Sequence, residues 1–255
     1  MFAAVCRRSE REIPPKWANL EMRGSDPRHL VIFDCDGVLV DSEILACELQ
    51  ARALAEYGFS LTGADVARRF LGVSARDMRA ALEVDLGRPL PDDHETRCSA
   101  ELYDLFRREL KSVRGITEIV AALAASDHPR CVASSSSPER IALALDVADL
   151  YDHFRPHLFS STLVKHGKPA PDLFLYAADA MGFPPARCVV VEDSVNGVKA
   201  ARSAGMLALG FLGGSHCPRD HGDDLTRAGA DRICRTASEL SRTLSETAGT
   251  RFLTG

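Results

Sequence analysis

The sequence predicts an α/β protein: a doubly wound, mainly parallel sheet that carries a small inserted all-helical domain. Three short apolar runs support this prediction, over Leu30–Phe33, Arg130–Ala133 and Cys188–Val191. Each run is bounded by turn residues and followed by a helical pattern, and an unbroken apolar run of this length is typical of a strand covered on both faces. Strands that alternate with helices in this way form doubly wound domains.

The other elements of this domain continue the alternation. A weaker strand is expected over 206–212, and helices over 117–125, 138–151, 172–181, 195–204 and 238–247. Ser136 or Ser137 can cap the helix that begins at Pro138, because a serine hydroxyl accepts a hydrogen bond from the first turn and proline suits the first helical position.

The segment between the first two strands has helical periodicity and little strand signal. Helices are expected over 44–57, 64–70, 76–86 and 95–111. This segment is too long for a simple crossover between strands. We therefore expect residues 44–111 to form a helical cap, with 28–43 and 112–255 as the α/β core. Residues 1–27 are polar and Arg-rich without an apolar signal core, and we expect them to be a disordered leader.

Composition excludes several function classes. The formal net charge is −5 and no long Lys/Arg run occurs, which argues against nucleic acid or an anionic membrane as a partner. The sequence contains no apolar stretch long enough to span a bilayer. Its eight cysteines form no C-x-x-C pair, so zinc and redox spacings are missing and a reducing, cytoplasmic compartment is expected. We expect a monomer by default.

Acidic and polar residues follow the three predicted strands. Asp34 and Asp36 end the first, Ser134 ends the second, and Glu192 with Asp193 ends the third. Ligands bind outside the carboxyl ends of parallel strands. Carboxylate oxygens suit Mg²⁺, which would offset the repulsion between these acids and an incoming phosphate. The pattern therefore predicts a magnesium site.

Two further residues suit a phosphate. Ser134 at a helix start, with adjacent backbone N–H groups, would cradle the anion, and Lys168 would supply a point charge. Each feature alone has a structural explanation, since Asp-x-Asp is commonly a turn, serines are commonly caps and a lysine is commonly solvated. Their occurrence together, in this order, favours phosphoryl chemistry.

Four stretches together resemble the haloacid dehalogenase (HAD) superfamily of phosphohydrolases. They are Asp34–Glu43, Val132–Ser136, Lys168–Asp172 and Val189–Gly197. The resemblance spans about residues 30–215. The predicted helical insert stands where the β-phosphoglucomutase-like branch, which includes sugar-phosphate phosphatases, carries its cap.

The resemblance implies a role for each matched residue. Asp34 would attack phosphorus and form an aspartyl-phosphate. Asp36 would protonate the leaving alkoxide and then activate the hydrolytic water. Ser134 and Lys168 would hold phosphoryl oxygens. The implied Mg²⁺ ligands are Asp34, the backbone carbonyl of Asp36, Asp193, and Glu192 directly or through water.

Single residues separate the alternatives within the family. A dehalogenase lacks the acid/base aspartate, whereas Asp36 is present. A phosphonatase needs a cap lysine, but none occurs between Lys16 and Lys111. A β-phosphoglucomutase would have histidine at Ala46 and arginine at Ala75. These two departures favour simple hydrolysis and leave the mutase as the alternative.

A non-enzymatic signalling receiver domain also combines acidic residues, a phosphorylated Asp, Ser/Thr and Lys. Its phosphorylated Asp ends a third strand, and it has no helical insert of this size. We therefore predict a Mg²⁺-dependent phosphatase for a small phosphorylated metabolite, either a sugar phosphate or a sugar-acid phosphate. Contacts from the cap to this substrate are expected from Glu43, Leu71, Gly72, Ser74 and Arg76. His216, Cys217 and His221 form a loose cluster whose spacing matches no familiar metal site.

Overall fold

The computed structural model describes residues 28–70, 75–218 and 220–248, without the side chains of residues 75–77. Its strands form one parallel sheet in the order β3-β2-β1-β4-β5-β6. Their bounds are β1 Leu30–Phe33, β2 Arg130–Ser134, β3 Leu158–Ser160, β4 Cys188–Glu192, β5 Leu207–Phe211 and β6 Arg232–Cys234. The predicted doubly wound fold is confirmed.

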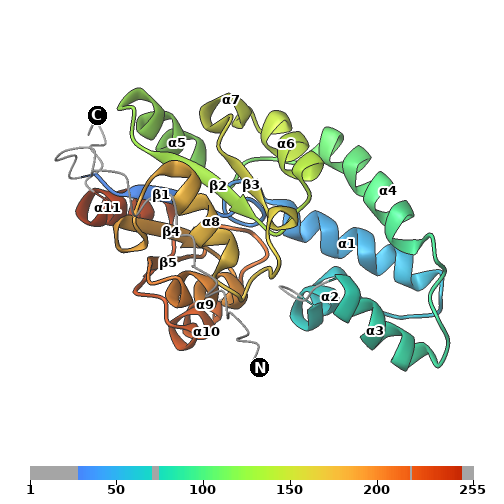
Figure 1. Cartoon of the computed structure of the whole chain (residues 1–255). Coiled ribbons are helices and arrows are strands. Elements are labelled where there is room, and N and C mark those ends of the chain that lie inside the picture. The colour runs from blue at the N-terminus through green and yellow to red at the C-terminus, as the bar shows by residue number, and fades with distance from the viewer. Residues whose placement is uncertain (1–27, 71–74, 219, 249–255) are drawn as a thin grey trace, which may run out of the picture.

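Helices cover both faces of the sheet (Figure 1). Val31 and Phe33 of β1 pack on one face, while Leu30 and Ile32 pack on the other, because successive strand side chains point to opposite sides. The first face is covered by α5 (Ile116–Ala125), α6 (Pro138–Val147), α7 (Tyr151–Phe154) and α11 (Ala237–Thr247). The second face is covered by α8 (Asp172–Met181), α9 (Val195–Ser203) and α10 (His221–Ala228).

The first four helices after β1, which precede α5 and β2, extend to one side of the sheet (Figure 1). Cys47, Leu54, Phe70 and Leu82 belong to their own small buried core. The later part of the fourth helix packs against the core of the sheet instead, through Phe106 and its neighbours. This separate core supports the proposal of a cap, whose exact boundaries stay a prediction. The bounds are α1 Ser42–Ala55, α2 Gly63–Phe70, α3 Ala75–Leu86 and α4 His94–Glu109.

The predicted helix over 138–151 is wrong in its length. Helix α6 ends at Val147, and Asp149 has a φ of 56° in the left-handed region, which stops the helix and lets Leu150 be fully buried. The chain resumes as α7 at Tyr151. At the start of α6, the capping residue is Ser137, whose hydroxyl accepts a hydrogen bond from the backbone N–H of Arg140 at 3.3 Å.

Four short elements have no counterpart in the prediction: β3, β6, α7 and α10. The first three have three or four residues each, too few for a periodic pattern to separate them from a loop. Helix α10 contains one large apolar residue, Leu225, so its sequence shows no apolar period. Two 3-10 turns, η2 (Ser161–Leu163) and η3 (Pro185–Arg187), complete the chain.

No described helix is long and apolar enough to cross a membrane. The seven cysteines in the described ranges are free thiols. The predicted leader, residues 1–27, lies outside the described residues.

Candidate active site

The candidate site lies where the winding of the sheet reverses. Strand β1 pairs with β2 on one side and with β4 on the other, so the chain adds β2 and β3 in one direction and β4, β5 and β6 in the opposite direction. Asp34 directly follows β1, and its backbone N–H donates to the carbonyl of Val191 in β4 at 3.0 Å. Ser134 and Glu192 are the last residues of β2 and β4. Parallel pairing therefore brings the predicted residues to one edge.

Lys168 links two of these acidic residues. Its Nζ donates to Asp34 Oδ1 at 2.8 Å, to Glu192 Oε1 at 2.6 Å and to the carbonyl of Ala133 at 3.0 Å. The side chain is 4% exposed, so these three acceptors replace the water that an ammonium group needs. Burial alone would lower the pKa of Lys168, but Asp34 and Glu192 outweigh it and raise that pKa above its ordinary value.

Glu192 is fully buried and uses both carboxylate oxygens. Its Oε1 accepts from Lys168, and its Oε2 accepts from the backbone N–H and the hydroxyl of Ser194 at 3.0 and 2.9 Å. The residue therefore holds Lys168 in place and anchors the start of α9.

Ser134 is also buried, and its hydroxyl accepts from the backbone N–H of Ser136 at 3.1 Å. This bond orders the serine-rich turn beside Asp36. Ser134 thus lies at the predicted edge, at the end of β2 where the loop to α6 begins.

Asp36 is held by three side-chain donors that the sequence did not identify as site residues. Its Oδ1 accepts from Ser42 Oγ at 2.6 Å and from Arg140 Nη2 at 2.8 Å, and its Oδ2 accepts from Ser136 Oγ at 2.5 Å. Burial favours the neutral acid, but Arg140, Ser136 and Ser42 outweigh it, so the pKa of Asp36 lies below its ordinary value. Asp36 is therefore a carboxylate in this arrangement.

The carboxylates of Asp34, Glu192 and Asp193 could hold a metal ion. Each is buried, and each offers an oxygen within 4.8 Å of the other two. Burial, reinforced by Glu192 and Asp193, raises the pKa of Asp34 well above its ordinary value although Lys168 opposes this. Such an excess of negative charge, presented by hard oxygen donors, fits a divalent cation such as Mg²⁺.

The backbone after Asp36 closes tightly onto this cluster. Gly37 has a φ of 76°, and a Cβ atom there would lie 2.0 Å from Asp193 Oδ2. Only glycine allows both this left-handed backbone and this close approach.

Two histidines from the segment after β5 contact Asp193. His216 Nε2 lies 2.9 Å from the carboxylate Oδ2, and His221 Nε2 donates to the backbone carbonyl at 2.6 Å. Burial would lower the pKa of His216, but its bonds to Asp193 and Cys217 outweigh this and raise the pKa to about 11. The predicted loose cluster thus packs against the acidic site, although nothing in its spacing indicated this.

Of the predicted cap contacts, Glu43 has a described environment. It lies in the first turn of α1, and burial, with Asp36 and Asp193 nearby, raises its pKa to about 7 although Arg140 and His216 oppose the shift. Arg76 lies in the first turn of α3, and its side chain lies outside what the structure describes. The same holds for Leu71, Gly72 and Ser74 altogether.

A cavity of about 250 Å³ lies among the cap helices, and Arg140 is one of the residues that line it. Leu49, Phe70 and Met78 give it apolar walls, while Gln50 and Ser99 add polar groups. Arg140 therefore connects the two places: its guanidinium bonds Asp36, and its side chain lines the cavity.

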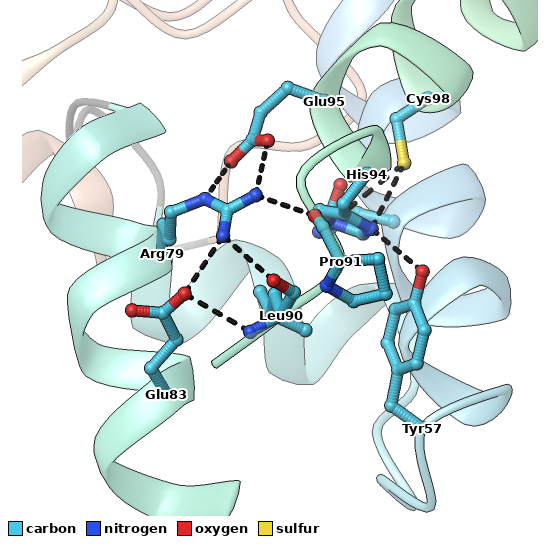
Figure 2. A network of polar contacts seen from close by, with 9 residues as sticks. Tyr57, Arg79, Glu83, Leu90, Pro91, His94, Glu95 and Cys98 are labelled. Atoms are coloured by element: carbon cyan, nitrogen blue, oxygen red, sulfur yellow. Dashed lines mark hydrogen bonds and ion pairs between the residues drawn. The ribbon is translucent and has the colours of Figure 1, made fainter. Parts of the chain in front are cut away.

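Behind this cavity, a polar network joins α3 to the start of α4 (Figure 2). Arg79 donates to both oxygens of Glu95 at 2.6 Å, to Glu83 at 2.8 Å and to the carbonyl of Pro91 at 2.8 Å. His94 is buried beside it, and burial lowers the pKa of its imidazole. The network therefore ties α3 to the start of α4 at the wall of the cavity.

The family model described as haloacid dehalogenase-like hydrolase matches residues 29–205. A 6-phosphogluconate phosphatase from Escherichia coli is 31% identical over 187 residues, which cover 73% of this chain and 83% of that protein. A phosphorylated carbohydrates phosphatase from Thermotoga maritima is 35% identical over 83% of this chain and 96% of its own. The crystal structure of a HAD family hydrolase from Deinococcus radiodurans, with bound phosphate and sodium, has a TM-score of 0.73 at 33% identity and covers 89% of this chain and 98% of its own.

Proposed function

Since the chain belongs to the haloacid dehalogenase-like hydrolases, we propose that it is a Mg²⁺-dependent phosphatase of a small phosphorylated metabolite, a sugar phosphate or a sugar-acid phosphate. The observation that carries this proposal is the pair of buried carboxylates after β1, with Lys168 bonded to Asp34 and a separate set of donors bonded to Asp36. The named activities of the Escherichia coli and Thermotoga maritima relatives support the substrate class.

In the first step, a carboxylate oxygen of Asp34 attacks phosphorus. A P–O bond to Asp34 forms, the P–O bond to the metabolite breaks, and the departing alkoxide takes a proton from Asp36. Lys168, which already bonds Asp34, would reach the phosphoryl oxygens and offset their charge. In the second step, Asp36 removes a proton from the attacking water, and Asp34 leaves as a carboxylate with inorganic phosphate as the product.

The proton that Asp36 carries in the first step restricts its partners. Ser42 and Ser136 can reorient their hydroxyl groups to accept from a protonated acid, whereas the guanidinium of Arg140 has only donors. The Arg140 bond therefore suits the carboxylate form, and it has to loosen when Asp36 is protonated.

The Mg²⁺ would be held by the carboxylates of Asp34 and Asp193 and by the backbone carbonyl of Asp36. When bound, the ion offsets charge on the phosphoryl oxygens and on the carboxylates. Glu192 would support the site without binding the ion directly, because its two oxygens already bond Lys168 and Ser194.

The metabolite would extend from Asp36 past Arg140 into the cap cavity. The volume of about 250 Å³ lies below the range of drug-sized pockets and suits a small metabolite. Ala46 lines this cavity at the position where a β-phosphoglucomutase would have histidine. The cap helices would close over the site and exclude water from the first transfer.

A phosphate-release screen tests the proposal. Wild-type protein with Mg²⁺ should release phosphate from sugar phosphates or sugar-acid phosphates, and Asp34→Asn should not. No release from any phosphorylated metabolite would contradict the phosphatase.

The mutase alternative has its own assay. With β-glucose 1-phosphate and a bisphosphate primer, we expect free phosphate as the product, whereas efficient conversion to glucose 6-phosphate would favour the mutase. Membership of a hydrolase family argues against the signalling-domain alternative.

A further inference from the structure

Asp193 is held from two directions by histidines to which the reaction above gives no task. His216 contacts the carboxylate and His221 contacts the backbone carbonyl of the same residue. His216 lies in the turn after β5, and His221 is the first residue of α10. One short segment therefore controls both the side chain and the main chain of a residue at the acidic site.

The protein leaves space for the imidazole of His216 in particular. The side chain is 1% exposed and lies against two glycines. A Cβ atom at Gly37 would lie 2.7 Å from His216 Cε1, and one at Gly214 would lie 2.6 Å from the same atom. Such distances are too short for real contacts, so any side chain at either glycine would displace the ring.

The two nitrogens of this ring differ in their contacts. Nε2 contacts Asp193, whereas Nδ1 is buried without a hydrogen-bond partner among the described residues. An unsatisfied buried polar atom is unfavourable, and an apolar ring would fill the same space without that cost. The Nε2 contact with Asp193 is the compensating interaction that explains a histidine here.

We propose that His216 is a positioning residue for a divalent cation: by holding Oδ2 of Asp193, it fixes the orientation of the carboxylate that would bind the ion. His221 fixes the backbone of the same residue. Carboxylate ligands are commonly oriented by such hydrogen bonds, and losing one typically weakens metal affinity by about 10–100-fold. This inference rests on the proposed function, because it takes Asp193 as a ligand of Mg²⁺.

Calorimetric titration of the full chain with MgCl₂ alone tests the proposal without an activity assay. His216→Ala should raise the Kd for Mg²⁺ by about 10–100-fold. His216→Gln places an amide N–H near the position of Nε2 and should restore most of the affinity. His216→Asn, whose shorter amide lies nearer the position of Nδ1, should not. The exposed His166 provides a control, and His166→Ala should keep the wild-type Kd.

Three results would overturn the proposal. One is a wild-type Kd in His216→Ala. Another is an equal affinity for Mg²⁺ in the Gln and Asn variants. This comparison of two polar replacements remains decisive if the alanine variant does not fold. The third is wild-type protein that binds no Mg²⁺, which would also remove the metal from the proposed function. The first two results leave the proposed phosphatase intact, so the two failures can be told apart.

Discussion

The guanidinium of Arg140 lies 2.8 Å from Oδ1 of Asp36, and the same side chain lines the cap cavity. This contact joins a residue in the first turn of α6 to the loop after β1. Arg140 also lies over the ring of Phe106 in α4, 5.4 Å from its centroid. It therefore ties the proposed acid/base carboxylate to the helices that surround the cavity.

Replacing Arg140 should change the pH dependence of turnover. Arg140 helps to hold the pKa of Asp36 below its ordinary value, so Arg140→Met should raise that pKa. The second step needs Asp36 as a base, and we therefore expect the acidic limb of the kcat profile to move to higher pH. Phosphate release measured from pH 4 to pH 8 would show this. An unmoved limb would contradict the role of Arg140, and Arg140→Lys, which keeps the charge, is the matched control.

Asp34→Asn should remove turnover and leave the fold intact. The amide is not a nucleophile, so no aspartyl-phosphate can form. The substitution also removes one of three neighbouring buried carboxylates, so we expect a Tm equal to or above that of the wild type. Phosphate release and thermal unfolding check the two parts. Asp152→Asn, at an exposed position of α7, should affect neither, and retained turnover in Asp34→Asn would contradict the nucleophile.

Lys168→Met should destabilise the protein as well as reduce turnover. It leaves Asp34 and Glu192 buried without their shared cation, and breaking a buried pair by removing one partner costs about 3–5 kcal/mol. Urea unfolding measures that loss. Lys168→Arg should not restore stability fully, because a planar guanidinium cannot reproduce three bonds from a single nitrogen. A variant as stable as the wild type would show that the acids find other partners.

Glu43 should make stability fall as pH rises. Its pKa is raised from 4.5 to about 7 in the folded protein. Its contribution to the free energy of unfolding is therefore fully present below pH 4.5 and is lost as pH rises through 7. With a chelator present, Glu43→Gln should be more stable than the wild type by about 2 kcal/mol at pH 8, and the two should agree near pH 4.5. Urea unfolding at both pH values tests this. Glu48→Gln, at an exposed position of α1, should not alter the pH dependence, and parallel curves for Glu43→Gln and the wild type would refute the shift.

Removing Mg²⁺ should stop hydrolysis of a generic aryl phosphate. The cluster of Asp34, Glu192 and Asp193 would then repel an incoming phosphate without a compensating cation. Turnover in excess chelator, followed by re-addition of MgCl₂, measures the effect and its reversal. Activity that persists in chelator would contradict the metal.

Local patterns in the sequence were enough to predict the fold and much of the candidate site. Buried parallel strands appear as continuous apolar runs, and the residue after each run lies at the ligand-binding edge, independently of the conformation of the loops. Asp34, Ser134 and Glu192 could therefore be placed together from sequence. The short strands β3 and β6 could not, because a few residues hold too little pattern to distinguish a strand from a loop.

The α/β class, the helical insert and the residues that meet at the strand ends could be predicted from sequence, because they follow from local periodicity and from the direction of the strands. The bond from Arg140 to Asp36, across 104 residues of sequence, and the contact of His216 with Asp193 become visible in the folded protein alone. An arginine on a helix and a histidine in a loop carry no local sign of their partner. Their partners are set by how helices and loops pack above the sheet, where burial makes each unpaired charge costly and each suitable donor valuable.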